Sequence, residues 1–219
     1  MTTGTVDTQP GRRERKKQAT RQALQDAALR LVAERGLDRV TVEDISDAAD
    51  VATRTFFNYF SSKEEALLGN APRNVAAVHR LVVERPAGEA PLEAVCQVLR
   101  AMTLELAERR EESLLRQLVI ERHPGLLARQ LGVYASFERA LATAVTERLG
   151  ADQADPSYAR LVAAVAVAAA RSAVSSWRAD QGRRPLAELV DDAFAQLHHL
   201  GSPPPPRRPY RRRKTPHAG

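Results

Sequence analysis

Apolar residues recur at intervals of three and four along most of this chain, and that spacing predicts α-helices. In residues 13–35, Leu24, Ala28 and Leu31 follow this spacing, and Gly36 stands where a C-terminal cap is expected. We find no stretch in which apolar and polar residues alternate as in a strand. The pattern therefore predicts an all-α protein with about nine helices.

Two short helices joined by a tight turn are predicted after the first long one. Thr41-Val42-Glu43-Asp44 matches a capping box, and the helix that it starts ends near residue 49 or 50. Thr53 can cap a third helix over about 54–60. Ser61-Ser62, followed by two Glu residues at the capping spacing, marks a fourth start. This order is typical of a helix-turn-helix unit.

Glycine and proline separate the remaining helices. Gly69 and Pro72 predict a break or kink, and further helices are expected at residues 73–84, 91–109, 112–122, 125–149, 156–181 and 185–200. The longest apolar run, LVAAVAVAAA at residues 161–170, is too short to cross a membrane and favours a buried helix.

Four of the ten aromatic residues lie between Phe56 and Phe60. Projection at about 100° per residue puts these two Phe rings on one side of the third helix and Asn58 opposite, flanked by Arg54 and Thr55. A helix under two turns long is not stable alone in water, so the rings should anchor it to a core. Arg54, Thr55 and Asn58 would then face outward, and Arg or Asn can read base edges in a major groove. A plain core patch in a helical bundle is the alternative.

Charge supports an interaction with nucleic acid at a defined place. The formal net charge of +6 equals that of residues 201–219 alone, so residues 1–200 are neutral overall. Within that neutral part, residues 12–21 hold six bases and only one acid, Glu14. Because this run abuts the helix-turn-helix, phosphate contact or minor-groove reach is favoured over a simply solvated face.

Residues 12–67 resemble the DNA-binding domain of the TetR family of bacterial transcriptional regulators. The resemblance is carried by RRERKK, by AALRLVAERG and by TVEDISDAADVATRTFFNYFSSKEEAL. It implies a DNA-binding head at residues 12–68, with the motif at about 41–60, and a helical ligand-binding and dimerisation domain at 73–200.

The resemblance also assigns roles to single residues. It implies a phosphate contact for the start of the second helix, base contacts for the recognition helix, and sugar–phosphate contacts beyond it. Asp50 stands where the family usually has Gly, and Asp tolerates a left-handed turn. Phe57 replaces a common Tyr and can only pack along the sugar–phosphate backbone. The implied DNA-contacting residues are Thr41, Thr53, Arg54, Thr55, Phe57, Asn58, Tyr59 and Lys63.

A ligand-responsive dimer is the function that the resemblance implies. The family's common mode is repression from a palindromic operator, released by an apolar effector such as an acyl-CoA or a drug-like compound. The effector, operator and regulated genes are left open. Each candidate for the pocket wall can equally be plain core; these candidates are Leu104, Leu114, Leu118, Tyr134 and Phe137.

The last two helices have two possible partners. The Ala-rich helix at 156–181 and the apolar positions of 186–200 can pack inside the chain. The family resemblance favours instead a four-helix dimer interface made by these helices and their copies. The Gly69–Pro72 break, between head and body, is a place where ligand binding could move the head.

Other function classes find little support. Residues 73–200 lack a metal or nucleophile pattern and a Gly-rich phosphate loop, so we expect no enzyme, cofactor or metal. His198-His199 fits a helix end better than a metal site. The single Cys96 and the polar N-terminus, which does not match a signal peptide, favour a cytoplasmic protein without a membrane partner. The rival interpretation is a helical module that binds RNA or an anionic membrane.

Both ends of the chain are expected to be disordered. Residues 1–11 are polar, and residues 201–219 combine four consecutive prolines with a cluster of Arg residues. The tail can attract DNA without sequence preference, or it can be inert. Deletion of residues 203–219 should flatten the salt dependence of DNA binding if the first holds.

Overall fold

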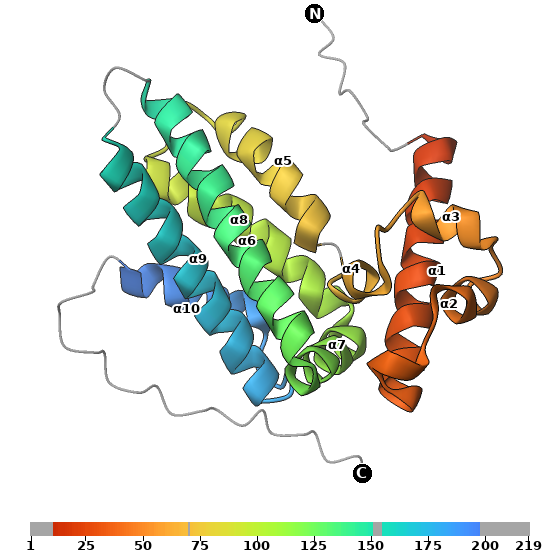
Figure 1. Ribbon diagram of the computed structural model, residues 1–219. Coiled ribbons are helices and arrows are strands. Elements are labelled where there is room, and N and C mark those ends of the chain that lie inside the picture. The colour runs from red at the N-terminus through yellow and green to blue at the C-terminus, as the bar shows by residue number, and fades with distance from the viewer. Residues whose placement is uncertain (1–10, 70, 151–154, 198–219) are drawn as a thin grey trace, which may run out of the picture.

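The computed structural model describes residues 11–69, 71–150 and 155–197, except for the side chains of residues 71–74 and 76. Within these ranges the chain forms ten α-helices, one 3-10 helix and no strand (Figure 1). The helices are α1 (Arg12–Arg35), η1 (Leu37–Arg39), α2 (Val42–Ala48), α3 (Thr53–Phe57), α4 (Lys63–Leu67), α5 (Ala71–Val83), α6 (Pro91–Glu108), α7 (Arg110–Arg122), α8 (Pro124–Leu149), α9 (Pro156–Ala179) and α10 (Leu186–Leu197). The all-helical prediction is confirmed. The terminal segments expected to be disordered and His198-His199 lie outside the described residues.

Helices α1 to α4 stand beside the bundle of α5 to α10 (Figure 1). One hydrophobic core joins α1, α2, α3 and α4, and it is completed by Val119, Ile120 and Leu126 from α7 and α8. A second core fills the bundle, where α8 packs against α5 and α9, and α9 packs also against α6 and α10. The head therefore shares part of its core with the body, so a change in α7 can reach it directly.

Helix α9 is the central helix of the bundle. It is long and apolar enough to cross a membrane, but half of its most apolar window is buried inside the protein. Ten of its side chains, among them Ala163, Ala166 and Trp177, are buried. The Ala-rich run predicted as a buried helix is thus a core helix, although Leu161 at its start is 60% exposed.

Two local expectations about α3 are wrong. Thr53 is not the N-cap: Ala52 holds that extended position without a side-chain hydrogen bond, and Thr53 is the first helical residue. The helix also ends at Phe57, and the chain continues as a turn in which the Tyr59 and Phe60 amides donate to the Phe56 carbonyl. The aromatic rings hold this short helix in place, so a side-chain cap is not required.

Two turns behave as the sequence predicts. Asp50 adopts a left-handed conformation, with φ at 54°, in the turn between α2 and α3. Gly69 has φ at 70° just beyond α4, where the break toward α5 was expected. Left-handed backbone is accessible to Gly at no cost and to Asp at a small one.

Candidate DNA-binding face and ligand cavity

The start of α2 is fixed by its own first turn. The Asp44 amide donates to Thr41 Oγ1 at 3.1 Å, and the Thr41 amide donates to Asp44 Oδ2 at 2.8 Å. The predicted capping box is therefore present. The pKa of Asp44 is lowered, because the Thr41 amide and then its hydroxyl donate to the charged carboxylate.

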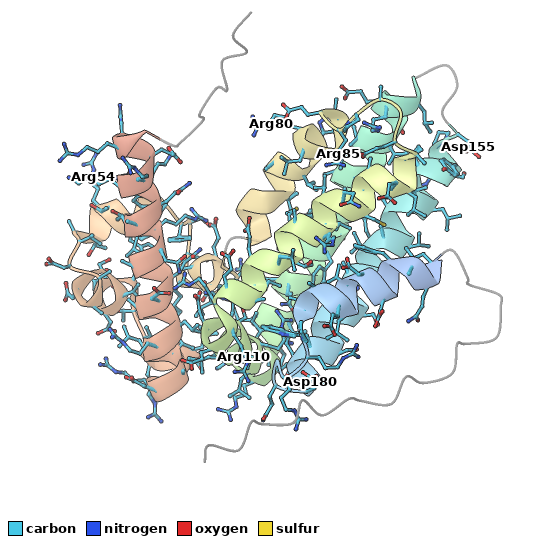
Figure 2. All side chains as sticks on the ribbon, turned by 180° about the vertical axis from the view of Figure 1, so that it is seen from behind. Arg54, Arg80, Arg85, Arg110, Asp155 and Asp180 are labelled. Atoms are coloured by element: carbon cyan, nitrogen blue, oxygen red, sulfur yellow. The ribbon has the colours of Figure 1, made fainter. Side chains whose placement is uncertain are left out.

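Helix α3 has a buried aromatic side and an exposed polar side. Phe56 and Phe60 are 0% and 1% exposed, and their ring centroids lie 5.5 Å apart. Arg54 and Asn58 are exposed, and Phe57 is 57% exposed. The predicted orientation is confirmed for the two rings, which point inward, and for Arg54 and Asn58, which are exposed. Thr55, also expected to face outward, is half-buried. Figure 2 shows Arg54 near the end of the head where α1 begins.

The basic run at the start of α1 divides into two groups. Five cations are exposed: Arg12, Arg13, Arg15, Lys16 and Lys17. Arg21 instead donates to the Tyr59 carbonyl at 2.9 Å and stacks over the Phe60 ring at 4.2 Å from its centroid. Arg21 therefore helps to hold the turn after α3, while the exposed five lie at the same end of the head as Arg54.

The other predicted contact residues differ in exposure. Thr41 is exposed, and Thr53, Thr55 and Tyr59 are half-buried. Lys63 Nζ donates to the Leu37 and Val40 carbonyls, both at 2.8 Å, and so ties α4 to η1. An ammonium group has three hydrogens, so one donor of Lys63 remains for a phosphate.

A cavity of about 230 Å³ lies in the body between α6, α7, α8 and α9, and it reaches α1 and the end of α4. Of the predicted pocket residues, Tyr134 and Phe137 line it. The rest of its apolar wall is built by Leu68, Leu99, Met102, Leu106, Ile120, Val133, Val167, Ala170 and Val174.

The other three pocket candidates lie elsewhere. Leu114 and Leu118 line a separate, outer groove of about 1010 Å³ between α7, α8 and α9, and Leu104 lines neither space. On α7, it is Glu112, Ser113, Arg116 and Ile120 that line the cavity. Helical spacing predicts which residues share a face, but not which neighbour that face meets.

The cavity and the outer groove share a polar partition. Its four members line both spaces: Gln130, Tyr134, Arg171 and Arg178. Arg178 Nη1 donates to Gln117 Oε1 at 2.6 Å, and the Arg171 guanidinium lies over the Tyr134 ring at 4.4 Å from its centroid. Sequence reasoning assigned no function to Arg171 or Arg178, because neither belongs to a motif.

Ion pairs connect this cavity to the head. Glu112 pairs with Arg116 on α7 and with Arg109 Nε, the latter at 2.5 Å. Arg109 also donates to Asp26 on α1 at 2.9 Å, and Arg116 donates to the Leu67 carbonyl at the end of α4 at 2.8 Å. Burial lowers the pKa of Arg116. We name these four side chains, Asp26, Arg109, Glu112 and Arg116, the head–body joint.

Gly69 belongs to the same contact. A Cβ added there would meet the Arg116 guanidinium at 3.2 Å, and the left-handed φ already disfavours a side chain. Arg109, Glu112, Arg116 and Gly69 all line the cavity. The spacing of Arg109, Glu112 and Arg116 could have suggested local ion pairs, but the contacts with α1 and α4 have no signal in the sequence.

Residues 24–68 match the family model described as "Bacterial regulatory proteins, tetR family", and residues 89–200 match the model of the MftR C-terminal domain. The helical fold indicates the same class of protein, and so does the division of α3 into a buried aromatic face and an exposed polar face. This chain belongs to the TetR family of bacterial transcriptional regulators.

Particular relatives agree with this class. The chain is 35% identical to the HTH-type transcriptional regulator TcmR of Streptomyces glaucescens, over 86% of this chain and 87% of that protein. It is 28% identical to a protein described as the mycofactocin biosynthesis transcriptional regulator MftR of Mycobacterium tuberculosis, over 82% and 90%. Both relatives are described as transcriptional regulators and not as enzymes.

A solved structure shares the fold. The transcriptional regulator FadR of Bacillus subtilis, in complex with stearoyl-CoA, superposes with a TM-score of 0.56 at 19% identity, over 80% of this chain and 96% of that chain. At this identity the likeness concerns the fold.

Proposed function

We propose that this protein is a homodimeric repressor that binds a palindromic operator and is released by a small apolar effector. The observation that carries the proposal is the orientation of α3, where Phe56 and Phe60 are buried and Arg54 and Asn58 face outward. Its site of action is the cytoplasm, where a bacterial operator lies.

On the DNA side, the exposed face of α3 enters the major groove. Arg54 and Asn58 read base edges there, and Thr53 and Thr55 lie on the same short helix. Thr41, Tyr59, Lys63 and the exposed cations at the start of α1 contact the backbone, with Phe57 packed against the sugars. A single short helix reads few base pairs, so two copies on a palindrome are needed for selectivity.

The dimer is proposed to form mainly through α9. One face of this helix is not covered by its own chain and follows a spacing of three and four residues, typical of a helix–helix seam. That face comprises Tyr158, Leu161, Val165, Ala168, Ser172, Ser175 and Ala179; Val165 is half-buried and the others are exposed. Small residues along it allow a second helix to approach closely.

Helix α10 contributes less than the family resemblance implies. Its apolar residues Leu186, Leu189, Val190 and Phe194 are buried in the core of the same chain. Its exposed positions include Glu188, Asp191 and Asp192. The alternative of packing inside the chain therefore describes α10 better, and the uncovered face of α9 is the stronger candidate for the dimer contact.

The effector is proposed to bind in the cavity. An apolar ligand is supported by the aliphatic wall, by Phe137, and by the shared fold with a FadR that holds stearoyl-CoA. Four groups of the cavity wall, Arg109, Glu112, Arg116 and Gly69, also contact or adjoin the head. A ligand that shifts Arg116 would weaken its bond to the Leu67 carbonyl and so alter how α4 holds the head.

Footprinting of the full chain on the DNA beside its own coding region tests the proposal. We expect one protected palindrome, with both halves lost together as the protein is diluted. The Arg54→Ala variant is the matched control, because it changes one exposed side chain of the reading face. Protection of no discrete site, or a preference for single-stranded RNA, would favour the helical interaction module instead.

A further inference from the structure

We infer that the effector carries a carboxylate, bound by Arg178 and Arg171 with Tyr134 at the partition, while its apolar body fills the cavity. This inference rests on the proposed function, because it names the chemistry of the same cavity. The aliphatic wall alone predicts only an apolar ligand, whereas this inference requires the ligand to carry an acidic group as well.

The charges that line the cavity are unequally neutralised. Four arginines and two acids line it, and two of these arginines, Arg109 and Arg116, share Glu112 within the head–body joint. Arg171 and Arg178 have no ion pair with any of the described residues. Positive charge in excess of the protein's own acids is therefore concentrated at the partition.

Arg178 is held in position by neutral groups. Its Nη1 donates to Gln117 Oε1 at 2.6 Å, and Gln117 Nε2 in turn donates to Glu121 Oε1 at 2.7 Å. Tyr134 also hydrogen-bonds to Arg178, and Glu121 acts on it at longer range. These contacts orient the guanidinium without cancelling its charge at close range.

The rest of the Arg178 guanidinium is poorly satisfied. Its Nε is buried and has no hydrogen-bond partner among the described residues. The pKa of Arg178 is lowered, chiefly because burial disfavours the charged form. A half-buried cation whose nearest acid, Glu121, acts only at longer range is costly. A carboxylate can offer both an opposite charge and two acceptors to the guanidinium fork.

Arg171 places a second cation on the same partition. Arg171 lies about two turns before Arg178 on α9, so both point to the same side of the helix. Arg171 stacks on Tyr134, one of the residues shared by cavity and groove. Arg171 is itself exposed. An acid whose apolar part lies in the cavity would therefore meet two cations, Arg178 and Arg171, at the partition.

The rival explanation is that Arg178 is only structural and ties α9 to α7 through Gln117. That explanation predicts that loss of Arg178 destabilises the fold and lowers the affinity for acidic and neutral ligands alike. A carboxylate site predicts that loss of Arg178 affects acids but not their neutral counterparts.

Fluorescence titration of the purified full chain distinguishes the carboxylate site from the purely structural role of Arg178. Trp177 is the only tryptophan, is buried and directly precedes Arg178, so its emission reports on this region. The probes are two matched pairs, decanoate with 1-decanol and 2-naphthoate with 2-naphthol, titrated at pH 7 without DNA. We expect at least one acid to bind tenfold or more tightly than its neutral partner.

Variants then test which residue causes the preference for the acid. Arg178→Met should remove the preference for the acid and leave binding of the neutral partner within about twofold, and Arg178→Lys should retain part of it. Arg160→Met, on the exposed side of α9, is the matched control and should behave as the wild type. Arg171→Met provides a second, surface variant should Arg178→Met fail to give a cooperative thermal transition.

Two outcomes would overturn the inference. One is that neither acid binds more tightly than its neutral partner. The other is that Arg178→Met, or Arg171→Met in its place, leaves the preference intact or weakens acid and neutral partner equally. DNA release is measured separately: an acid preference without any effect on operator binding would contradict the proposed function while the carboxylate site stands.

Discussion

The helices of the head and those of the body are held in place by different kinds of side chain. In the head, α3 has only five residues and is held by the rings of Phe56 and Phe60, with Arg21 stacked on the second. In the body, α8 and α9 have 26 and 24 residues and are packed largely through Ala, Val and Leu. Short helices need large anchors, whereas long helices hold their own shape and can enclose a cavity.

Arginine also has opposite uses in the two regions. Arg54 in the head is exposed, so folding does not desolvate its charge, and the charge is available to a partner. In the body, the side chain of Arg116 is only 12% exposed, and its charge is met by Glu112. A buried charge must be neutralised by the protein or by a ligand, which is why the interior arginines mark the cavity rather than the DNA-binding face.

The largest effect should come from removing an anchor of the head. Phe60→Ala should lower the free energy of unfolding by about 3–5 kcal/mol, because it removes a fully buried ring from a small core. Urea denaturation measures this change. Phe57→Ala is the control and should cost less than about 1 kcal/mol, since that ring is 57% exposed. Equal costs for both variants would contradict the anchoring role.

The next effect concerns the joint between the two regions. Arg116→Leu should destabilise the protein by about 2–3 kcal/mol, because it leaves the Leu67 carbonyl and part of Glu112 without a partner. It should also reduce the effect of the effector on operator affinity, measured by fluorescence anisotropy of labelled DNA. Arg122→Leu, exposed on the same helix, should change neither quantity. An undiminished ligand response in Arg116→Leu would remove the joint from the mechanism.

A smaller effect is expected at the reading face. Arg54→Ala should weaken binding to the operator by about 1–3 kcal/mol and leave the free energy of unfolding unchanged. The measurement is the ratio of operator to random-sequence affinity at one fixed salt concentration. An unchanged ratio would show that Arg54 does not read bases.

The smallest effect should appear at the capping box. Thr41→Ala should cost about 1 kcal/mol of stability through the lost cap of α2. Because the folded-state pKa of Asp44 is lowered, its contribution is present at neutral pH and disappears as the pH falls through the acidic range of the carboxylate. The stability difference between wild type and Asp44→Asn should therefore narrow from pH 7 to pH 3, as followed by thermal unfolding. A constant difference would contradict the hydrogen bond to the charged form.

Local features of the fold were determined by the sequence alone. The helix positions, the capping box at Thr41 and the inward side of α3 follow from spacings of a few residues. The left-handed Asp50 was implied by the resemblance to the TetR family. Periodicity and capping act within one or two turns, so they can be read without knowing what packs against the helix. The same local reasoning failed at Thr53, because the anchored rings of α3 made a cap unnecessary.

Only the tertiary structure decided where the interior charges lie and which face of α7 meets the cavity. Arg109 meets Asp26 across 83 positions, and Arg178 meets Gln117 across 61. Lys63 meets the Leu37 and Val40 carbonyls across 26 and 23. Such contacts depend on how whole helices are placed against one another. The residues around a charged side chain in the sequence do not indicate its partner. The pairing is set only when packing brings the two groups together and excludes the water between them.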